Sequence, residues 1–154
     1  MSALFKPNQA DPAWADRMPY RKRALLSPAE LRFFRALSIA LAGQWNVSLK
    51  TRLADLVECP PALWNTPHGR RLSQKHVDFV LYHPRTAIAA AVLELDDRSH
   101  ESSDRRTRDE FVDSALRCAG IRVLRVRASS SYHVETLRRY LDLAMRPRRK
   151  RRVD

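Results

Sequence analysis

Two apolar segments that carry acidic residues constrain the fold of this chain most. The segment 77–81 holds Asp78, and the segment 88–95 holds Glu94 and is followed at once by Asp96. Such short, nearly continuous apolar runs are typical of strands that are buried on both faces, in the middle of a helix-covered sheet. Buried carboxylates are costly unless they are paired, and converging carboxylates repel one another. We therefore expect a helix-covered sheet with a cation beside its acidic residues.

The other helix and strand signals complete an α/β pattern. Ser27, Pro28 and Glu30 mark a helix start, because serine suits the N-cap, proline suits the first helical position, and glutamate completes a capping box. We expect helices at 28–43, 102–119 and 133–145, strands at 45–50, 77–81, 88–95 and 121–126, and a long loop at 54–74 that begins with a helical turn. This order, αβββαβα, predicts a mixed central sheet of about four strands flanked by helices.

Length and charge limit the domain organisation and the partners. The 154 residues suit one domain, which we place at 25–145, between a flexible basic arm at 1–24 and a basic, disordered tail at 146–154. The chain has 29 Lys and Arg against 17 Asp and Glu, a formal net charge of +12. This excess favours a nucleic acid over an anionic membrane surface, although a basic surface also serves solubility or a ribosomal contact.

The N-terminal segment and the cysteines indicate a cytoplasmic protein. Residues 1–10 lack the apolar run of a signal peptide, and no segment approaches the length of a transmembrane helix. Cys59 and Cys118 are too few for a zinc cluster or a disulfide framework. We expect a reducing compartment, no membrane partner, and a cytoplasmic protein that can associate with the nucleoid.

The acidic residues of the two segments are the candidates for chemistry. Glu94 and Asp96 lie two residues apart and so point to one side of the sheet, and Asp78 lies on the neighbouring strand. Mg²⁺ or Mn²⁺ suits such carboxylates, because a hard cation takes one or two of them together with water and phosphate oxygens. His100 is a candidate general base or phosphate contact, and Lys75 a candidate positive charge. Asp96 and Lys75 also fit an exposed strand end and an ordinary surface lysine.

Clustered basic residues are the candidates for nucleic-acid binding. Arg105, Arg106 and Arg108 crowd the start of the expected helix at 102–119, where positive charge opposes the helix dipole. The arrangement is favourable if this helix end faces a phosphate, and it also fits a solvated face balanced by neighbouring acids. The full candidate set adds the residues Arg125, Arg148, Arg149, Lys150, Arg151 and Arg152. DNA is the first expected partner and RNA the second.

Several motifs together resemble a known family. They are Leu25–Glu30 with Phe33 and Phe34, Lys75–Val80, Glu94–Asp97 with His100, Asp109, and Gly120–Arg125. They resemble the bacterial family called domain of unknown function 2726, and more widely the PD-(D/E)XK restriction-endonuclease-like superfamily, near the very-short-patch repair endonucleases. The resemblance implies a nuclease-like fold, often dimeric, with Asp78 and Glu94 at the metal-binding positions and Glu30 joining them from the first helix.

The chain departs from these patterns at two positions, and the first is Asp97, which replaces the glycine common in the repair-endonuclease-like relatives. The superfamily has a lysine two residues after the glutamate, and Asp96 stands there in this sequence. Lys75, His100 or Arg125 would have to take its place. The first hypothesis is thus a Mg²⁺-dependent endonuclease that hydrolyses DNA. The alternatives are a nucleic-acid-binding module of the same fold that does not cut, and a basic protein-interaction domain.

Overall fold

The computed structural model describes residues 19–96 and 103–146, with residues 103–109 described by their backbone alone. The first described helix, α2 (Pro28–Leu41), begins where the capping box predicts. The Ser27 backbone N–H donates to Glu30 Oε2 at 2.7 Å, and the Glu30 N–H donates to Ser27 Oγ at 3.3 Å. Apolar residues at helical spacing, among them Phe33 and Leu37, then bury one side of the helix.

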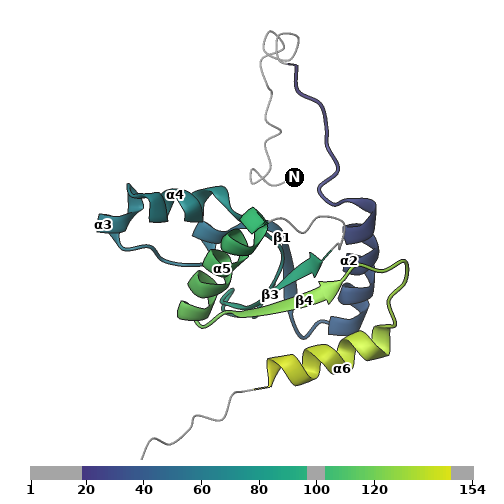
Figure 1. The fold of residues 1–154 in the computed structure, drawn as a ribbon. Helices are drawn as coiled ribbons and strands as arrows, with labels where there is room; N and C mark the ends of the chain where they lie inside the picture. Colours follow the sequence, from purple (N-terminus) through teal and green to yellow (C-terminus); the bar gives the residue numbers. More distant parts are fainter. Residues whose placement is uncertain (1–18, 97–102, 147–154) are drawn as a thin grey trace, which may run out of the picture.

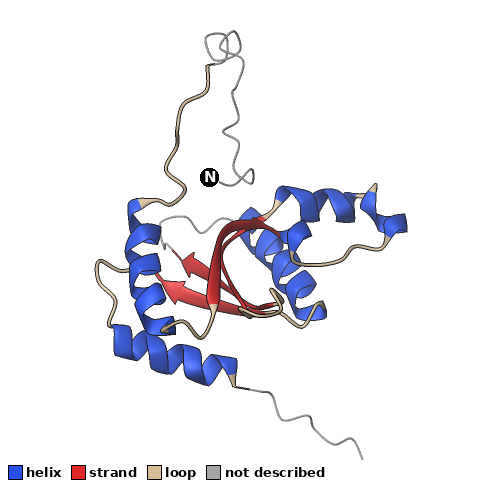
Figure 2. Ribbon diagram, turned by 180° about the vertical axis from the view of Figure 1, so that it is seen from behind, coloured by secondary structure: helices blue, strands red, loops and turns tan. Residues whose placement is uncertain are grey.

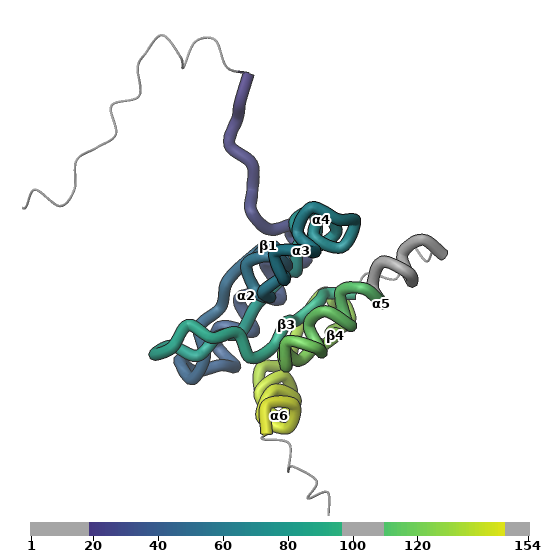
Figure 3. The backbone as a smooth tube through the Cα atoms, turned by 90° about the vertical axis from the view of Figure 1, so that its left-hand side faces the viewer, coloured from purple at the N-terminus to yellow at the C-terminus, as the bar shows by residue number. Residues whose placement is uncertain are grey.

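The centre of the molecule is a four-stranded mixed sheet, as expected from the sequence. Its strands are β1 (Asn46–Arg52), β2 (His76–Tyr82), β3 (Ala89–Asp96) and β4 (Arg122–Arg127), in the spatial order β1-β2-β3-β4. β1, β2 and β3 pair antiparallel, whereas β3 and β4 pair parallel. The parallel pair needs a crossover, which α5 (Ser103–Cys118) supplies. Figures 1 and 3 show α5 running along β3 and β4.

Helices cover both faces of this sheet, which explains the apolar runs of the central strands. α2 and α6 (Val134–Met145) lie on one face, and α5 lies on the other (Figure 2). Leu53 of a short 3₁₀ turn, η1 (Leu53–Asp55), packs on the same side as α5. Each face has its own buried cluster. Phe33, Phe79 and Leu93 belong to the first cluster, and Val80 and Val92 belong to the second. The described residues contain no helix with the length and apolarity needed to cross a bilayer.

The prediction of a long loop at 54–74 was wrong over most of its length. Two short helices occupy it, α3 (Pro61–Trp64) and α4 (Pro67–Gln74). Pro61 and Pro67 occupy first-turn positions, where proline favours a helix rather than breaking it. Thr66 caps α4 by accepting a hydrogen bond from the His68 N–H at 3.2 Å, and Leu72 anchors the helix in the core.

Candidate functional site

Four charged residues form a row across the sheet, one from each strand. The pairs on either side of Lys50 in the β1–β2 register place it opposite Asp78, and continuing the β2–β3 register by one residue places Asp78 opposite Glu94. Glu94 is in turn the direct partner of Arg125 on β4. Residues that face each other across neighbouring strands extend their side chains to the same face, so the four groups are neighbours. The order along the row is positive, acidic, acidic, positive.

Lys50 holds the first of these acids together with a residue of the first helix. Its Nζ atom lies 2.7 Å from Asp78 Oδ1 and 2.5 Å from Glu30 Oε1. The exposed fraction of the side chain is 30% for Lys50, 21% for Asp78 and 16% for Glu30. This double salt bridge is therefore half-buried, and solvent can still reach it. The other Glu30 oxygen is held by the capping box of α2. The helix start therefore positions the carboxylate that orients Lys50.

The backbone of Lys50 is unusual for a strand. Its φ angle is +49°, in the left-handed region, and Lys50 is left out of a strand register whose two neighbouring positions are paired. Such a conformation in a residue other than glycine costs about 1–3 kcal/mol, and it is found where the surroundings hold it in place. The two carboxylate bonds of the ammonium supply that restraint here.

Two half-buried carboxyl groups meet in the middle of the row. Asp78 Oδ2 accepts a hydrogen bond from the backbone N–H of Leu95 at 3.1 Å, which ties the carboxylate to β3. Burial, the charge of Asp78 and a hydrogen bond with it raise the pKa of Glu94 from 4.5 to about 8, against the opposing effects of Arg125 and Lys50. Glu94 is thus largely protonated at neutral pH, as expected for two acids that compete for one place.

Lys50 and Glu30 both stay ionised at neutral pH. Burial lowers the pKa of Lys50, but its hydrogen bonds with Asp78 and Glu30 outweigh burial and raise the pKa overall. Burial raises the pKa of Glu30, and the bonds from Lys50 and Ser27 reverse that shift and lower it. Lys50 is therefore an ammonium ion, which can attract an anion but cannot accept a proton.

Arg125 closes the row on the side of β4. Its guanidinium donates to Asp113 Oδ1 on α5 at 2.9 Å, and its charge favours the ionised form of Glu94. It links the acidic pair to the crossover helix rather than facing solvent alone. Its predicted role as a nucleic-acid contact stays a prediction, and so does its predicted role as the substitute for the missing lysine.

The structure brings some of the predicted site residues together and separates others. Asp78 and Glu94 meet in the row and Glu30 is linked to it through Lys50, whereas Asp96 is exposed at the end of β3. Lys75 ends α4, and its side chain forms no hydrogen bond or ion pair within the described residues.

Other predicted residues lie where their side chains cannot be placed. His100 and the tail residues Arg148, Arg149, Lys150, Arg151 and Arg152 lie outside the described residues. Arg105, Arg106 and Arg108 lie in the first turns of α5, as expected, but only the backbone is described there.

Sequence reasoning missed Lys50. It ends a short expected strand and carries no local motif, and its partners lie 20 and 28 residues away in the chain. One signal was available: a lysine at the edge of a predicted sheet beside a strand that carries a buried acid. Arg52, two residues on, pairs instead with Asp55 at 2.8 Å.

The resemblance implies a divalent cation, and the side chains around the row must be able to coordinate it. Within residues 19–96 and 103–146 no group of three or more His, Cys, Asp or Glu side chains is placed to hold a metal ion. Mg²⁺ needs fewer, because one or two carboxylates with waters and phosphate oxygens complete its shell. Asp78 and Glu94 are such a pair, and their mutual repulsion is what a cation would relieve. The residues present therefore fit a magnesium ion held mainly by water and substrate.

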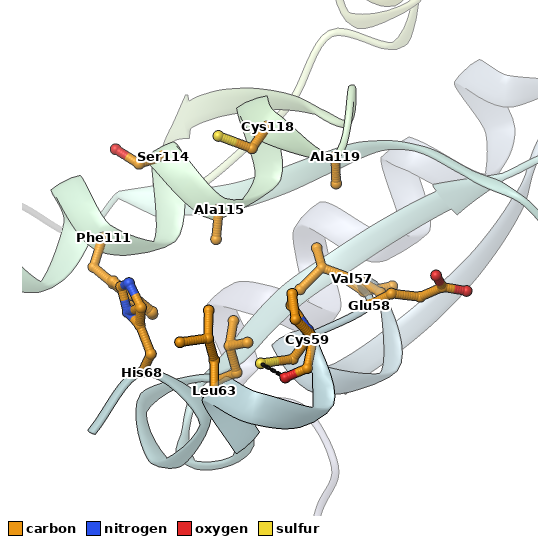
Figure 4. Close-up of a pocket in the computed structure, with 13 residues that line it drawn as sticks. Val57, Glu58, Cys59, Leu63, His68, Phe111, Ser114, Ala115, Cys118 and Ala119 are labelled. Carbon is orange, nitrogen blue, oxygen red and sulfur yellow. Dashed lines mark hydrogen bonds between the residues drawn. The ribbon is translucent and has the colours of Figure 1, made fainter. Parts of the chain in front are cut away.

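A second concave feature lies away from the row. An apolar groove of about 710 Å³ runs between the segment 56–60, α4 and α5. Figure 4 shows His68 of α4 beside Phe111 of α5, and their ring centroids are 5.5 Å apart. Cys59 and Cys118 line the groove as free thiols. None of the four residues of the row lines it, so its chemistry is separate from that of the acids.

Comparisons with known proteins identify one family. The model of the family described as "Protein of unknown function (DUF2726)" matches residues 22–145, which is most of the chain. No curated protein and no solved structure matches the chain. The family match covers all four strands of the sheet and both acids in the middle of the row.

Proposed function

The chain belongs to the DUF2726 family, and we propose that it is a magnesium-dependent nuclease that hydrolyses phosphodiester bonds in DNA. One observation carries the proposal: two carboxyl groups, Asp78 and Glu94, lie against each other on adjacent central strands, and the pKa of Glu94 is raised to about 8. A carboxyl group whose pKa is strongly raised by burial and by a neighbouring acid is typical of catalytic sites, and a hard cation is the usual partner of two adjacent carboxylates.

Each residue of the row has a part in this proposal. Asp78 and Glu94 would hold the metal ion, which supplies a Lewis acid for the phosphate and a more acidic bound water. Lys50 places a positive charge at the same edge, where it can face the phosphate. It supplies the charge that the superfamily pattern places at the position of Asp96. Glu30, held by the helix cap, orients Lys50, and Arg125 restrains Glu94 from the other side.

The charge of the whole chain supports a polyanionic substrate. A formal net charge of +12 attracts the phosphate backbone without regard to sequence. A mixed sheet between helices, with acids on its central strands, also agrees with what the resemblance to the PD-(D/E)XK superfamily implies. Membership of that superfamily is therefore part of the proposal.

A second function is favoured by a separate observation. Lys50 already occupies one oxygen of Asp78, and the described residues offer no third acidic or imidazole ligand near the pair. A site whose charges are balanced in this way also suits a nucleic-acid-binding module that keeps the fold and does not cut. The two proposals differ only in whether a metal ion enters the site.

A cleavage assay on isosteric variants tests the proposal. Purified protein is incubated with plasmid and single-stranded DNA, with Mg²⁺ or Mn²⁺ against EDTA. We expect metal-dependent cleavage that falls at least about a hundredfold in Asp78→Asn and in Glu94→Gln, because each replaces a carboxyl group that would hold the metal ion with an amide, which is a weaker ligand for a hard cation. Glu135→Gln is the matched control, since this acid is exposed on α6 and pairs with Arg138 alone.

Each result decides between the candidates. Cleavage that is unaffected by both substitutions would place the active site elsewhere. DNA binding without cleavage under any metal supports the non-cutting module. Absence of DNA and RNA binding at low salt contradicts both nucleic-acid functions.

A further inference from the structure

We propose that Lys50 is a built-in cation that competes with the divalent metal ion for Asp78, so that metal binding requires the ammonium to leave this carboxylate. The inference rests on the metal site of the proposed function and concerns how that site is loaded. It assigns Lys50 a role that the sequence pattern does not indicate. The geometry around Asp78 and Glu30 carries the argument.

Both oxygens of Asp78 are in use. Oδ1 accepts from Lys50 Nζ at 2.7 Å, and Oδ2 accepts from the backbone N–H of Leu95 at 3.1 Å. The amide belongs to the sheet and cannot move without disrupting β3. The ammonium sits at the end of a flexible four-carbon chain and can move. An incoming cation that binds Asp78 therefore displaces Lys50 rather than Leu95.

Glu30 keeps the displaced ammonium close to Asp78. Its Oε1 atom bonds Lys50 Nζ at 2.5 Å, while its Oε2 atom is held by the Ser27 N–H at the start of α2. When the ammonium leaves Asp78 it still has a fixed partner, so a half-buried charge is not left unpaired. Glu30 thus acts as a positioning residue that retains Lys50 beside the site after the metal ion has entered.

The backbone conformation of Lys50 indicates that its ion pairs with Asp78 and Glu30 stabilise a strained position. Lys50 adopts a φ of +49° at a position that the β1–β2 register omits. An extended residue there would continue the strand without this cost, and glycine or asparagine would adopt the left-handed region more readily. The strain is matched by the two carboxylate bonds of the ammonium, which points to a specific placement of positive charge at Asp78.

Electrostatics then sets the expected effect on metal affinity. An ammonium ion 2.7 Å from a ligand oxygen lowers the negative potential that a divalent ion meets. Removing this charge while keeping the length of the side chain should strengthen metal binding about tenfold. A purely structural role for Lys50 would predict unchanged or weaker binding, because loosening the bridge would disorder Asp78.

Mn²⁺ binding by the purified full chain, measured by isothermal titration calorimetry without DNA, tests the inference. We expect Lys50→Met and Lys50→Gln to bind Mn²⁺ about tenfold more tightly than the unaltered protein. Lys22→Met is the matched control, since this lysine is exposed before α2 and its side chain has no partner among the described residues, and the affinity of this variant should not change. Asp78→Asn should abolish the binding. Circular dichroism establishes that each variant is folded, and the glutamine variant serves if the methionine variant is not.

Equal or weaker Mn²⁺ binding in the folded Lys50 variants overturns the inference, and so does a lack of binding in every variant. The proposed nuclease activity is scored separately on the same samples. Tighter binding in Lys50→Met without any DNA cleavage by the unaltered protein contradicts the nuclease and upholds the cation. Cleavage by the unaltered protein, with an unchanged Mn²⁺ affinity in Lys50→Met, supports the nuclease and contradicts the role of Lys50 as a competing cation.

Discussion

At the scale of single residues, the charges around Asp78 balance without a metal ion. Lys50 neutralises one carboxylate of the pair formed by Glu30 and Asp78, and Glu94 avoids a further negative charge by holding a proton at neutral pH. Such a balance explains how acids are tolerated on central strands, where an unpaired charge would be prohibitive. Binding of a cation between Asp78 and Glu94 would therefore release the proton of Glu94.

The raised pKa of Glu94 predicts a pH dependence of stability. An unfolded chain titrates Glu94 near 4.5, whereas the folded protein holds the proton until about pH 8. Between these values the folded state binds more protons, so the free energy of unfolding falls as pH rises, by at most about 1.4 kcal/mol per pH unit. In Glu94→Gln this contribution is absent. The fall is complete above about pH 8, where both states are ionised.

Urea unfolding in EDTA at pH 5, 6, 7 and 8 measures this difference. The stability of Glu94→Gln relative to the unaltered protein should increase steadily from pH 5 to pH 8. Glu135→Gln, which removes an exposed carboxyl group on α6, should follow the unaltered protein at every pH. Parallel curves for Glu94→Gln and the unaltered protein would show that the Glu94 proton is not retained on folding.

At the scale of elements, local signals predicted the long helices and strands but not α3 and α4. The capping box at Ser27 and the apolar spacing after it predicted α2, because both act within a few residues. Pro61 and Pro67 stand at the starts of α3 and α4, where proline is favourable rather than disruptive. Helices this short have little stability of their own, and Leu72 shows that core packing holds α4.

The contact between these two helices predicts a cost for a single methyl group. Gly69 in α4 lies so close to the backbone of Trp64 at the end of α3 that a Cβ atom would overlap the Trp64 carbonyl. Gly69→Ala should therefore lower the free energy of unfolding by about 1–3 kcal/mol, although alanine is the better helix former. Urea unfolding measures the change.

Ser73→Ala is the control for this substitution. It lies in the same helix, and its hydroxyl bonds only the carbonyl of Arg70. It should change stability by no more than about 0.5 kcal/mol. A Gly69→Ala protein as stable as the unaltered one would mean that α3 and α4 separate without cost.

At the scale of the whole molecule, a compact sheet between helices carries a large positive charge. The net charge of +12 is a property of composition, and the tail contributes five basic residues within 147–154. If DNA is bound, each phosphate contact adds to the salt dependence of the affinity, with a slope of about 0.9 per contact. Removal of 147–154 should therefore reduce the slope of log affinity against log salt by up to about 4.5.

Fluorescence anisotropy with a labelled duplex, measured at several salt concentrations, gives this slope. Removal of 1–18 is the matched control, because that segment holds two basic and two acidic residues and so no net charge. Its slope should equal that of the full chain. An unchanged slope after removal of 147–154 would exclude the tail from phosphate contacts.

The sequence alone determined the strands, the long helices and the pair of acids, because periodicity, capping and buried polarity act locally or through burial. Asp78 and Glu94 were identified because an acid inside an apolar run stands out without any knowledge of its neighbours. Only the tertiary structure revealed Lys50. Its role depends on the register of β1 against β2, on a left-handed backbone, and on a helix start 20 residues earlier in the chain. A lysine side chain is compatible with almost any exposed position. Its place in the sequence therefore does not identify its ion-pair partner until the pairing of the strands is known.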